Sequence, residues 1–200
     1  MTRSALLARL VVVLGVVGFW TFASIGAARE PGYDPSVDYL SALAAVGATE
    51  PSWGFAMFAS ATLAVLATAW RVGSPLLAQA AASLAIGGAF RVSCPDGAAG
   101  CNAGALVVAP TLPGQVHSAG VLGYQLLLSA AMAHLAWRCR VAGRRRAAVA
   151  ALAGSLVPLL LATNPLPLDA GVSQRLWVVS GQFVLLMAVF WPARRTTVHP

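Results

Sequence analysis

Six long apolar stretches constrain the fold of this chain more than any other feature. Short polar segments separate them, and they lie at about residues 10–28, 53–70, 75–92, 116–137, 147–162 and 172–191. Charged residues make up only 10% of the 200 residues, against roughly 25% in soluble domains. So few polar side chains cannot cover a water-soluble globule of this size. The sequence therefore predicts an all-α, polytopic membrane helix bundle with six transmembrane helices, forming one domain over residues 1–200.

The charged residues sort to opposite sides of the predicted spans. Six spans place both termini on one side, together with ten of the thirteen arginines: Arg3, Arg9, Arg71, Arg138, Arg140, Arg144, Arg145, Arg146, Arg194 and Arg195. Arg29, Arg91, Arg175 and all six acidic residues fall on the other side. Because positive charge marks the cytoplasmic side, we expect a multi-pass protein of the cell (plasma) membrane with both termini in the cytoplasm. The net charge of +7 then reflects topology, and we expect no nucleic-acid partner.

The polar segment between the first two spans, residues 30–52, is predicted to hold one short helix. Asp34 followed by Pro35 is typical of a helix N-cap and first helical position, and Gly47 suits the C-terminal end. Apolar residues between them recur at helical spacing, at Tyr39, Leu40, Leu43 and Val46. We expect an amphipathic helix, with Asp38 on its polar side, that either lies on the outer membrane surface or caps the bundle.

The segment between the third and fourth spans contains two cysteines, Cys94 and Cys101. An oxidising compartment on the outer side favours a disulfide between them. The alternative is a metal pair completed by Asp96 or His117, but six intervening residues are not a usual zinc spacing. We therefore expect the disulfide and no metal site. Cys139 is predicted on the cytoplasmic side as a free thiol.

Ionisable residues at the outer ends of the spans form the candidate functional site. Asp38, Asp96 and His117 are the candidate catalytic residues, because a carboxylate can orient a histidine for general acid–base chemistry. Arg91 and Arg175 are the candidate ligand-binding residues, because guanidinium groups bind phosphate and other anions. The alternative is a structural network in which the two arginines pair with acidic residues and tie the loops together.

Three segments resemble the domain-of-unknown-function 998 family of bacterial integral membrane proteins. They are residues 32–47 after the first span, Trp53-Gly54-Phe55 at the start of the second, and the Cys-Pro-Asp loop that leads to His117. In the family pattern, an acidic residue follows the serine of the short helix after the first span. In this chain the residue that follows Ser41 is Ala42. The resemblance covers essentially the whole chain and implies a six-helix membrane bundle of uncharacterised function. It also implies that Asp38, Asp96 and His117 match the polar motifs of the family.

Two functions from different classes are consistent with these features. The first is an integral membrane protein of uncharacterised function that binds a lipid or a protein partner through a polar site on its outer face. The alternative is a membrane-embedded hydrolase or transferase that acts on a lipid headgroup at the outer leaflet. Both use the same residues, so an enzyme and a binding protein remain alternatives. No nucleotide-binding loop, haem motif or HExxH motif occurs, and we expect no cofactor. Membrane lipids are the expected partners.

Overall fold

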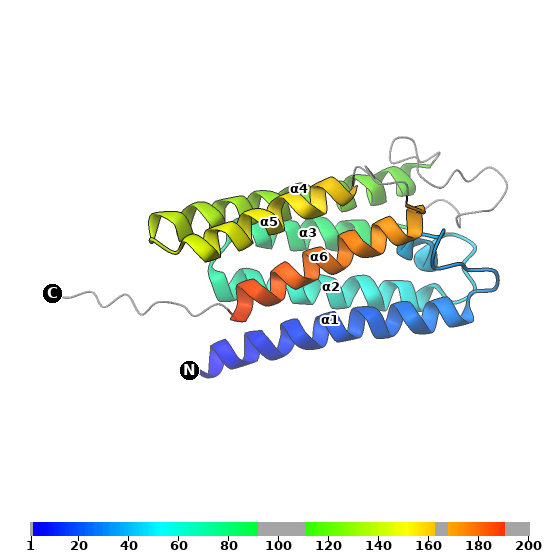
Figure 1. Ribbon diagram of the computed structural model, residues 1–200. Coiled ribbons are helices and arrows are strands. Elements are labelled where there is room, and N and C mark those ends of the chain that lie inside the picture. The colour runs from blue at the N-terminus through cyan, green and yellow to red at the C-terminus, as the bar shows by residue number, and fades with distance from the viewer. Residues whose placement is uncertain (1, 92–110, 163–167, 191–200) are drawn as a thin grey trace.

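The computed structural model describes residues 2–91, 111–162 and 168–190, and these residues confirm the all-α prediction. In these described ranges, six α-helices and one 3-10 helix (η1) follow one another: α1 (Arg3–Arg29), η1 (Leu40–Ala44), α2 (Pro51–Val72), α3 (Pro75–Ala89), α4 (Leu112–Val141), α5 (Arg145–Ala162) and α6 (Ala170–Phe190). Successive α-helices lie alongside one another and run in alternating directions (Figure 1). The chain is therefore an antiparallel helical bundle.

Four helices among the described residues are long and apolar enough to cross a membrane: α1, α2, α4 and most of α6. The third predicted span is shorter than expected, because α3 has 15 residues and ends at Ala89. At 1.5 Å per residue it extends about 22 Å, against about 30 Å for the hydrocarbon core. The chain thus has the helices of a multi-pass membrane protein, with four candidate spans of full length.

The helix ends follow local sequence signals. Pro51 and Pro75 occupy the first turns of α2 and α3, where a missing amide hydrogen costs nothing. The Ser74 hydroxyl accepts a hydrogen bond from the Leu77 amide at 3.3 Å. Gly73 ends α2 in the left-handed region, with φ of 65°. A tight turn therefore joins α2 to α3.

Small residues bring neighbouring helices into backbone contact. A Cβ atom on Gly120 of α4 would lie 2.5 Å from the Gly87 amide nitrogen of α3. A Cβ atom on Gly15 of α1 would lie 2.7 Å from the Ser60 carbonyl oxygen of α2. Helices in lipid associate through this kind of close packing, because hydrocarbon supplies no hydrophobic driving force between them. The glycines therefore set the distances between the helices of each pair.

Polar side chains inside the bundle hydrogen-bond between helices. Trp20 Nε1 of α1 donates to Gln182 Oε1 of α6 at 2.7 Å. Trp177 Nε1 of α6 donates to Gln125 Oε1 of α4. Ser155 Oγ of α5 donates to the Ser129 carbonyl of α4 at 2.9 Å. The first two bonds connect α6 to α1 and to α4, the third connects α5 to α4, and all three satisfy groups that would be costly to leave unpaired in lipid.

Residues 30–50, which we call the cap, cover one end of the bundle. Its 3-10 helix packs against α1, α2 and α6, and the apolar side chains of η1, including Leu40 and Leu43, are buried. A Cβ atom on Gly54 of α2 would lie 2.6 Å from the Ala44 amide nitrogen, so the contact excludes any larger residue. Of the two placements that the sequence left open, the described residues show the cap on the bundle, and the expected short helix is a five-residue 3-10 helix.

Charges gather at the two ends of the bundle. We call the end with the cap the cap end; it holds Arg29, Arg91, Arg175 and the described acidic residues Glu30, Asp34, Asp38, Glu50 and Asp169. The opposite end, which we call the arginine end, holds Arg3, Arg9, Arg71, Arg138, Arg140, Arg144, Arg145 and Arg146, and none of the described acidic residues lies there. α1 begins and α6 finishes at the arginine end (Figure 1).

Replacing Gly120 by Ala should destabilise the protein by about 1–3 kcal/mol, because the added methyl group meets the backbone of α3 and must separate two helices. Gly181→Ala is the matched control, since its Cβ would meet Leu128 at an ordinary 3.4 Å. Alanine favours a helix over glycine by about 1 kcal/mol, so the control should be neutral or stabilising. Thermal unfolding of the detergent-purified variants measures both, and equal melting temperatures would contradict the packing described.

Candidate functional site

The first turn of α6 fixes the cap on the bundle. The Val172 amide donates to the Ser36 carbonyl at 3.1 Å. The Gln174 side-chain oxygen accepts from the Leu40 amide at 2.6 Å. A Cβ atom on Gly171 would lie 2.6–2.8 Å from three cap carbonyl oxygens, so glycine is required there. The free amides at the start of a helix need acceptors, and the cap backbone supplies one.

Arg175, a predicted ligand-binding residue, bonds to the cap. Its Nη1 donates to the Asp38 carbonyl at 2.9 Å and to the Gly171 carbonyl at 3.0 Å. Its Nη2 donates to the Tyr33 hydroxyl, and its guanidinium carbon lies 5.7 Å from the centre of the Tyr33 ring. Arg175 and Asp38 are therefore brought together as predicted, but through the main chain of Asp38.

Arg91, the second predicted ligand-binding residue, reaches the cap from the end of α3. Its Nε donates to the Ala44 carbonyl at 3.3 Å, and its Nη2 donates to the Ala45 carbonyl. The last carbonyls of a helix have no partner within it, and a nearby arginine is a favourable donor. Arg91 thus donates to carbonyls at the end of η1, and Arg175 donates to the Asp38 carbonyl ahead of η1.

Asp38 is buried, with 9% of its surface exposed. Its Oδ2 accepts from the Asp34 amide at 2.7 Å, which closes a turn within the cap. Asp34 itself accepts from the Ser36 hydroxyl at 2.7 Å and the Ser36 amide at 2.8 Å, and these bonds hold the pKa of the Asp34 carboxyl below its usual range. The predictions of an α-helix that begins at Asp34 and exposes Asp38 are wrong, because side chain-to-backbone bonds stabilise a turn here.

His117 lies in the second turn of α4 and is buried, with 6% of its surface exposed. Its Nδ1 lies 2.7 Å from the Gly87 carbonyl and 3.1 Å from the Phe90 carbonyl. Carbonyl oxygens only accept, so Nδ1 carries the hydrogen, and Nε2 of the neutral ring carries the lone pair. The His117 and Phe58 rings lie nearly perpendicular to each other, with their centres 5.6 Å apart. His117 therefore binds the last turn of α3, directly before Arg91.

Four predicted site residues therefore lie at the cap end, where each is bonded to the main chain. Arg91, Arg175 and His117 each bind backbone carbonyls, and Asp38 binds a backbone amide. Asp96, Cys94 and Cys101 lie outside the described residues, as does the predicted disulfide. Cys139 is buried and is a free thiol, as predicted. Within the described ranges, no group of three or more His, Cys, Asp or Glu side chains could hold a metal ion.

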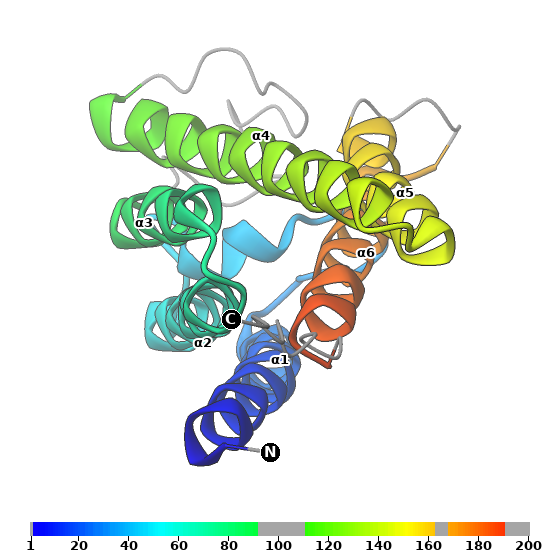
Figure 2. The same ribbon diagram turned by 90° about the vertical axis from the view of Figure 1, so that its left-hand side faces the viewer.

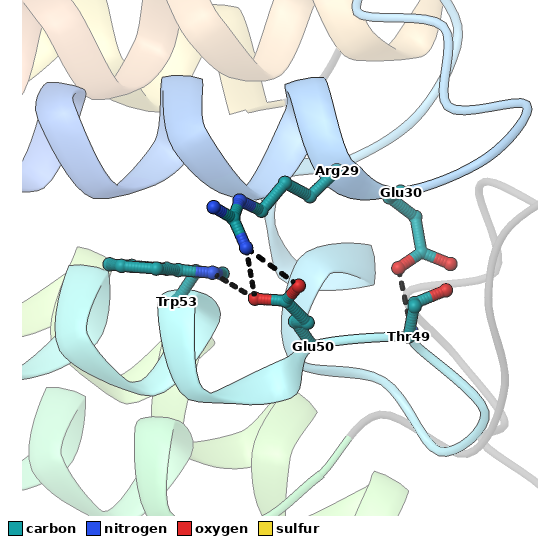
Figure 3. Close-up of polar contacts among 5 residues, drawn as sticks. All are labelled: Arg29, Glu30, Thr49, Glu50 and Trp53. Atoms are coloured by element: carbon teal, nitrogen blue, oxygen red, sulfur yellow. Dashed lines mark hydrogen bonds and ion pairs between the residues drawn. The ribbon is translucent and has the colours of Figure 1, made fainter.

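A second polar cluster joins the ends of α1 and α2 (Figure 3). Arg29 Nη1 donates to both carboxylate oxygens of Glu50, at 2.9 and 3.2 Å, and Trp53 Nε1 donates to Glu50 at 2.6 Å. The Glu30 carboxylate accepts from the Thr49 amide at 2.7 Å. The hydrogen bond from Trp53, followed by that from Arg29, lowers the pKa of Glu50. The cluster ties the first and last residues of the cap together.

Sequence reasoning missed two residues that hold the cap, Gln174 and Tyr33. Gln174 bonds to Leu40, and Tyr33 bonds to Arg175 and donates to the Tyr39 carbonyl at 3.3 Å. A polar residue directly before Arg175 in the first turn of the last span was the available signal. Two of these three partners, the Leu40 amide and the Tyr39 carbonyl, are backbone groups, which have no sequence pattern of their own.

The apolar helices and the charged residues at the two ends of the bundle define the class of protein. It is an all-α protein with several apolar helices, of the kind that lies in a membrane. Residues 13–191 match the model of a family described as "Protein of unknown function (DUF998)". The match covers most of the chain, so the chain belongs to this family, and the resemblance noted in the sequence is confirmed. No curated protein and no solved structure matches the chain.

Replacing Arg175 by Gln should destabilise the cap by about 2 kcal/mol or more, because bonds from a guanidinium to buried carbonyls are lost. Limited proteolysis of the cap and thermal unfolding measure the effect. Arg145→Gln removes an exposed arginine at the other end of the bundle and should change neither. A cap in the Arg175 variant that resists protease as well as the Arg145 variant would contradict this role.

Glu50 should make stability depend on pH in the acidic range. Its pKa is lower in the folded state than its ordinary value of 4.5, so its contribution is complete at neutral pH and is lost as the pH falls through the folded value. The effect is small, because the carboxylate is solvent-exposed. Melting temperatures between pH 7 and 3 should fall less steeply in Glu50→Gln than in the unmodified protein. Parallel pH profiles would contradict the pairing.

Proposed function

We propose that the chain is a plasma-membrane protein with six spans and both termini in the cytoplasm. Support comes from the alternating directions of the six helices and from the separation of charge between the two ends. The positive-inside rule assigns the arginine end to the cytoplasm and the cap to the outer face. In this arrangement α3 and α5 cross too, and the shorter α3 is accommodated by local thinning of the bilayer or by flanking residues.

The function that the geometry supports best is non-enzymatic binding of a lipid or protein partner at the cap. The observation that carries this proposal is the attachment of the cap to the bundle by Arg91 and Arg175 through its backbone carbonyls. A surface held rigidly in advance binds with less loss of conformational freedom. Val37 and Val46, which are 46% and 49% exposed, give this surface two apolar contacts.

One observation favours the alternative, a hydrolase or transferase at the outer leaflet. The Gly87 and Phe90 carbonyls orient the His117 ring and leave Nε2 as its basic nitrogen, which a general base requires. The observation against it is that Asp38, the described candidate acid, is bonded within the cap to the Asp34 amide. The binding function therefore has the stronger support.

Cysteine accessibility in intact cells tests the topology. In a chain whose native cysteines are replaced by serine, single cysteines at Thr49, Leu112 and Asp169 should react with a membrane-impermeant maleimide. A single cysteine at Arg145 should react only after the membrane is opened. Labelling of the Asp169 position only in opened cells would show that α5 does not cross. The same result at Leu112 would exclude a crossing by α3.

Photo-crosslinking in intact cells tests the binding function. A photoreactive residue at Val46 should give a discrete lipid or protein adduct, whereas one at Leu63, which is 55% exposed in the middle of α2, should give only general lipid labelling. The Val46 adduct should weaken at least about threefold in the Arg175→Gln variant, since the cap is then no longer fixed. Identical adducts at both positions would contradict a partner at the cap.

A further inference from the structure

A cavity of about 690 Å³ opens at the arginine end of the bundle. Its walls come from α4, α5 and α6, with the last residues of α2 on one side; Figure 2 looks onto this end. Most of the lining is apolar, as at Met132, Val157, Phe183 and Met187. The volume falls in the range of about 300–1,000 Å³ that is typical of small-molecule sites.

Three arginines line the part of this cavity where α2 and α4 end: Arg71, Arg138 and Arg144. Arg71 Nε is buried and is the one buried side-chain nitrogen or oxygen in the described part of the chain without a hydrogen-bond partner. A buried N–H group of a cation that lacks an acceptor is costly. None of the acidic residues that the structure describes is at this end, so the missing acceptor is not a nearby carboxylate.

We propose that this cavity binds an anionic phospholipid, with one acyl chain against the apolar wall and the phosphate on Arg71 and Arg138. Guanidinium groups pair with phosphate through two parallel hydrogen bonds, which would supply the acceptor that Arg71 Nε lacks. The wall continues to the outside of the bundle, since Phe183 is 61% and Val157 is 42% exposed. A lipid can therefore enter the cavity laterally from the bilayer. A soluble anion does not partition into the bilayer and would not use this route.

Charge also argues against two other occupants. Residues 191–200 contain two arginines and no acidic residue, so the C-terminal segment carries the same sign of charge as the cavity. The arginine end of a second copy would likewise bring arginines against arginines. An anionic lipid is the occupant whose charge and hydrophobicity both complement the lining. The leaflet it comes from, the cytoplasmic one, rests on the proposed topology, whereas the site itself does not.

Lipid binding to the full chain in detergent tests the proposal without reference to orientation. Native mass spectrometry compares dioleoyl phosphatidic acid with dioleoylglycerol, the same lipid without its phosphate. Phosphatidic acid should bind at least about tenfold more tightly, and Arg71→Gln should remove at least about tenfold of that affinity. Arg140→Gln removes an arginine from the same end that does not line the cavity, and it should change the affinity less than about twofold.

Cys139 provides a second readout on the unmodified protein, because it is buried and lines the cavity. Phosphatidic acid should slow alkylation of Cys139 at least about fivefold, as followed by peptide-resolved mass spectrometry, while inorganic phosphate should leave the rate unchanged. Ala150→Trp, which places a large side chain on the lining, should abolish binding of the lipid.

Five results would overturn the proposal. Equal affinity for the two lipids would show that the cavity does not bind the phosphate. An equal loss of affinity for phosphatidic acid in the Arg71 and Arg140 variants would show the same. Protection of Cys139 by inorganic phosphate alone would assign the cavity to a soluble anion. Protection that appears only with dimer formation would assign it to a second copy. A Cys139 that becomes reactive without lipid when residues 192–200 are deleted would assign it to the C-terminal segment. A failure of the topology test would leave all of these results unchanged.

Discussion

The structure depends on the need of backbone polar groups for partners where water is scarce. The helices satisfy their own amides and carbonyls, but the cap, with only five residues in a 3-10 helix, does not. Arg91 and Arg175 donate to its carbonyls, and the first turn of α6 supplies further bonds at Ser36 and Leu40. The segment between α1 and α2 is therefore folded onto the end of the bundle, where η1 buries its apolar side chains.

The two ends of the bundle use arginine in different ways. At the cap end, Arg91 and Arg175 bond to groups of the same chain. Arg29 pairs there with Glu50, which gives the only ion pair in the parts of the chain that the structure describes. At the arginine end, no described carboxylate side chain is available, and Arg71 keeps a buried nitrogen without a partner. The arginines of the cap end thus maintain the fold. At the arginine end Arg9 also bonds within the chain, to the Val189 carbonyl, whereas Arg71 keeps a nitrogen available for the ligand proposed for the cavity.

The sequence predicted the helices well, because a hydropathy pattern is a local property that the bilayer enforces. It also predicted that Asp38, Arg91, His117 and Arg175 would gather at one end, since Asp38 lies in the segment between the first two predicted spans and the other three lie at the span ends on the same side. It did not predict their partners. Those are backbone carbonyls and amides whose positions depend on how residues 30–50 fold back onto α6. Local signals at Asp34 and Pro35 favoured an α-helix, but packing against Gly54 and Gly171 selected a turn and a 3-10 helix.

Hydrogen–deuterium exchange of the protein in lipid nanodiscs tests the attachment of the cap most directly. The amides of Leu40 and Val172 are bonded between the cap and α6 and belong to neither element's own helical ladder. If the cap is folded onto the bundle, both should exchange at least about tenfold more slowly than the same amides in an unstructured peptide. Exchange of both at the unstructured rate, with α1 and α4 still protected, would show that the cap is not attached.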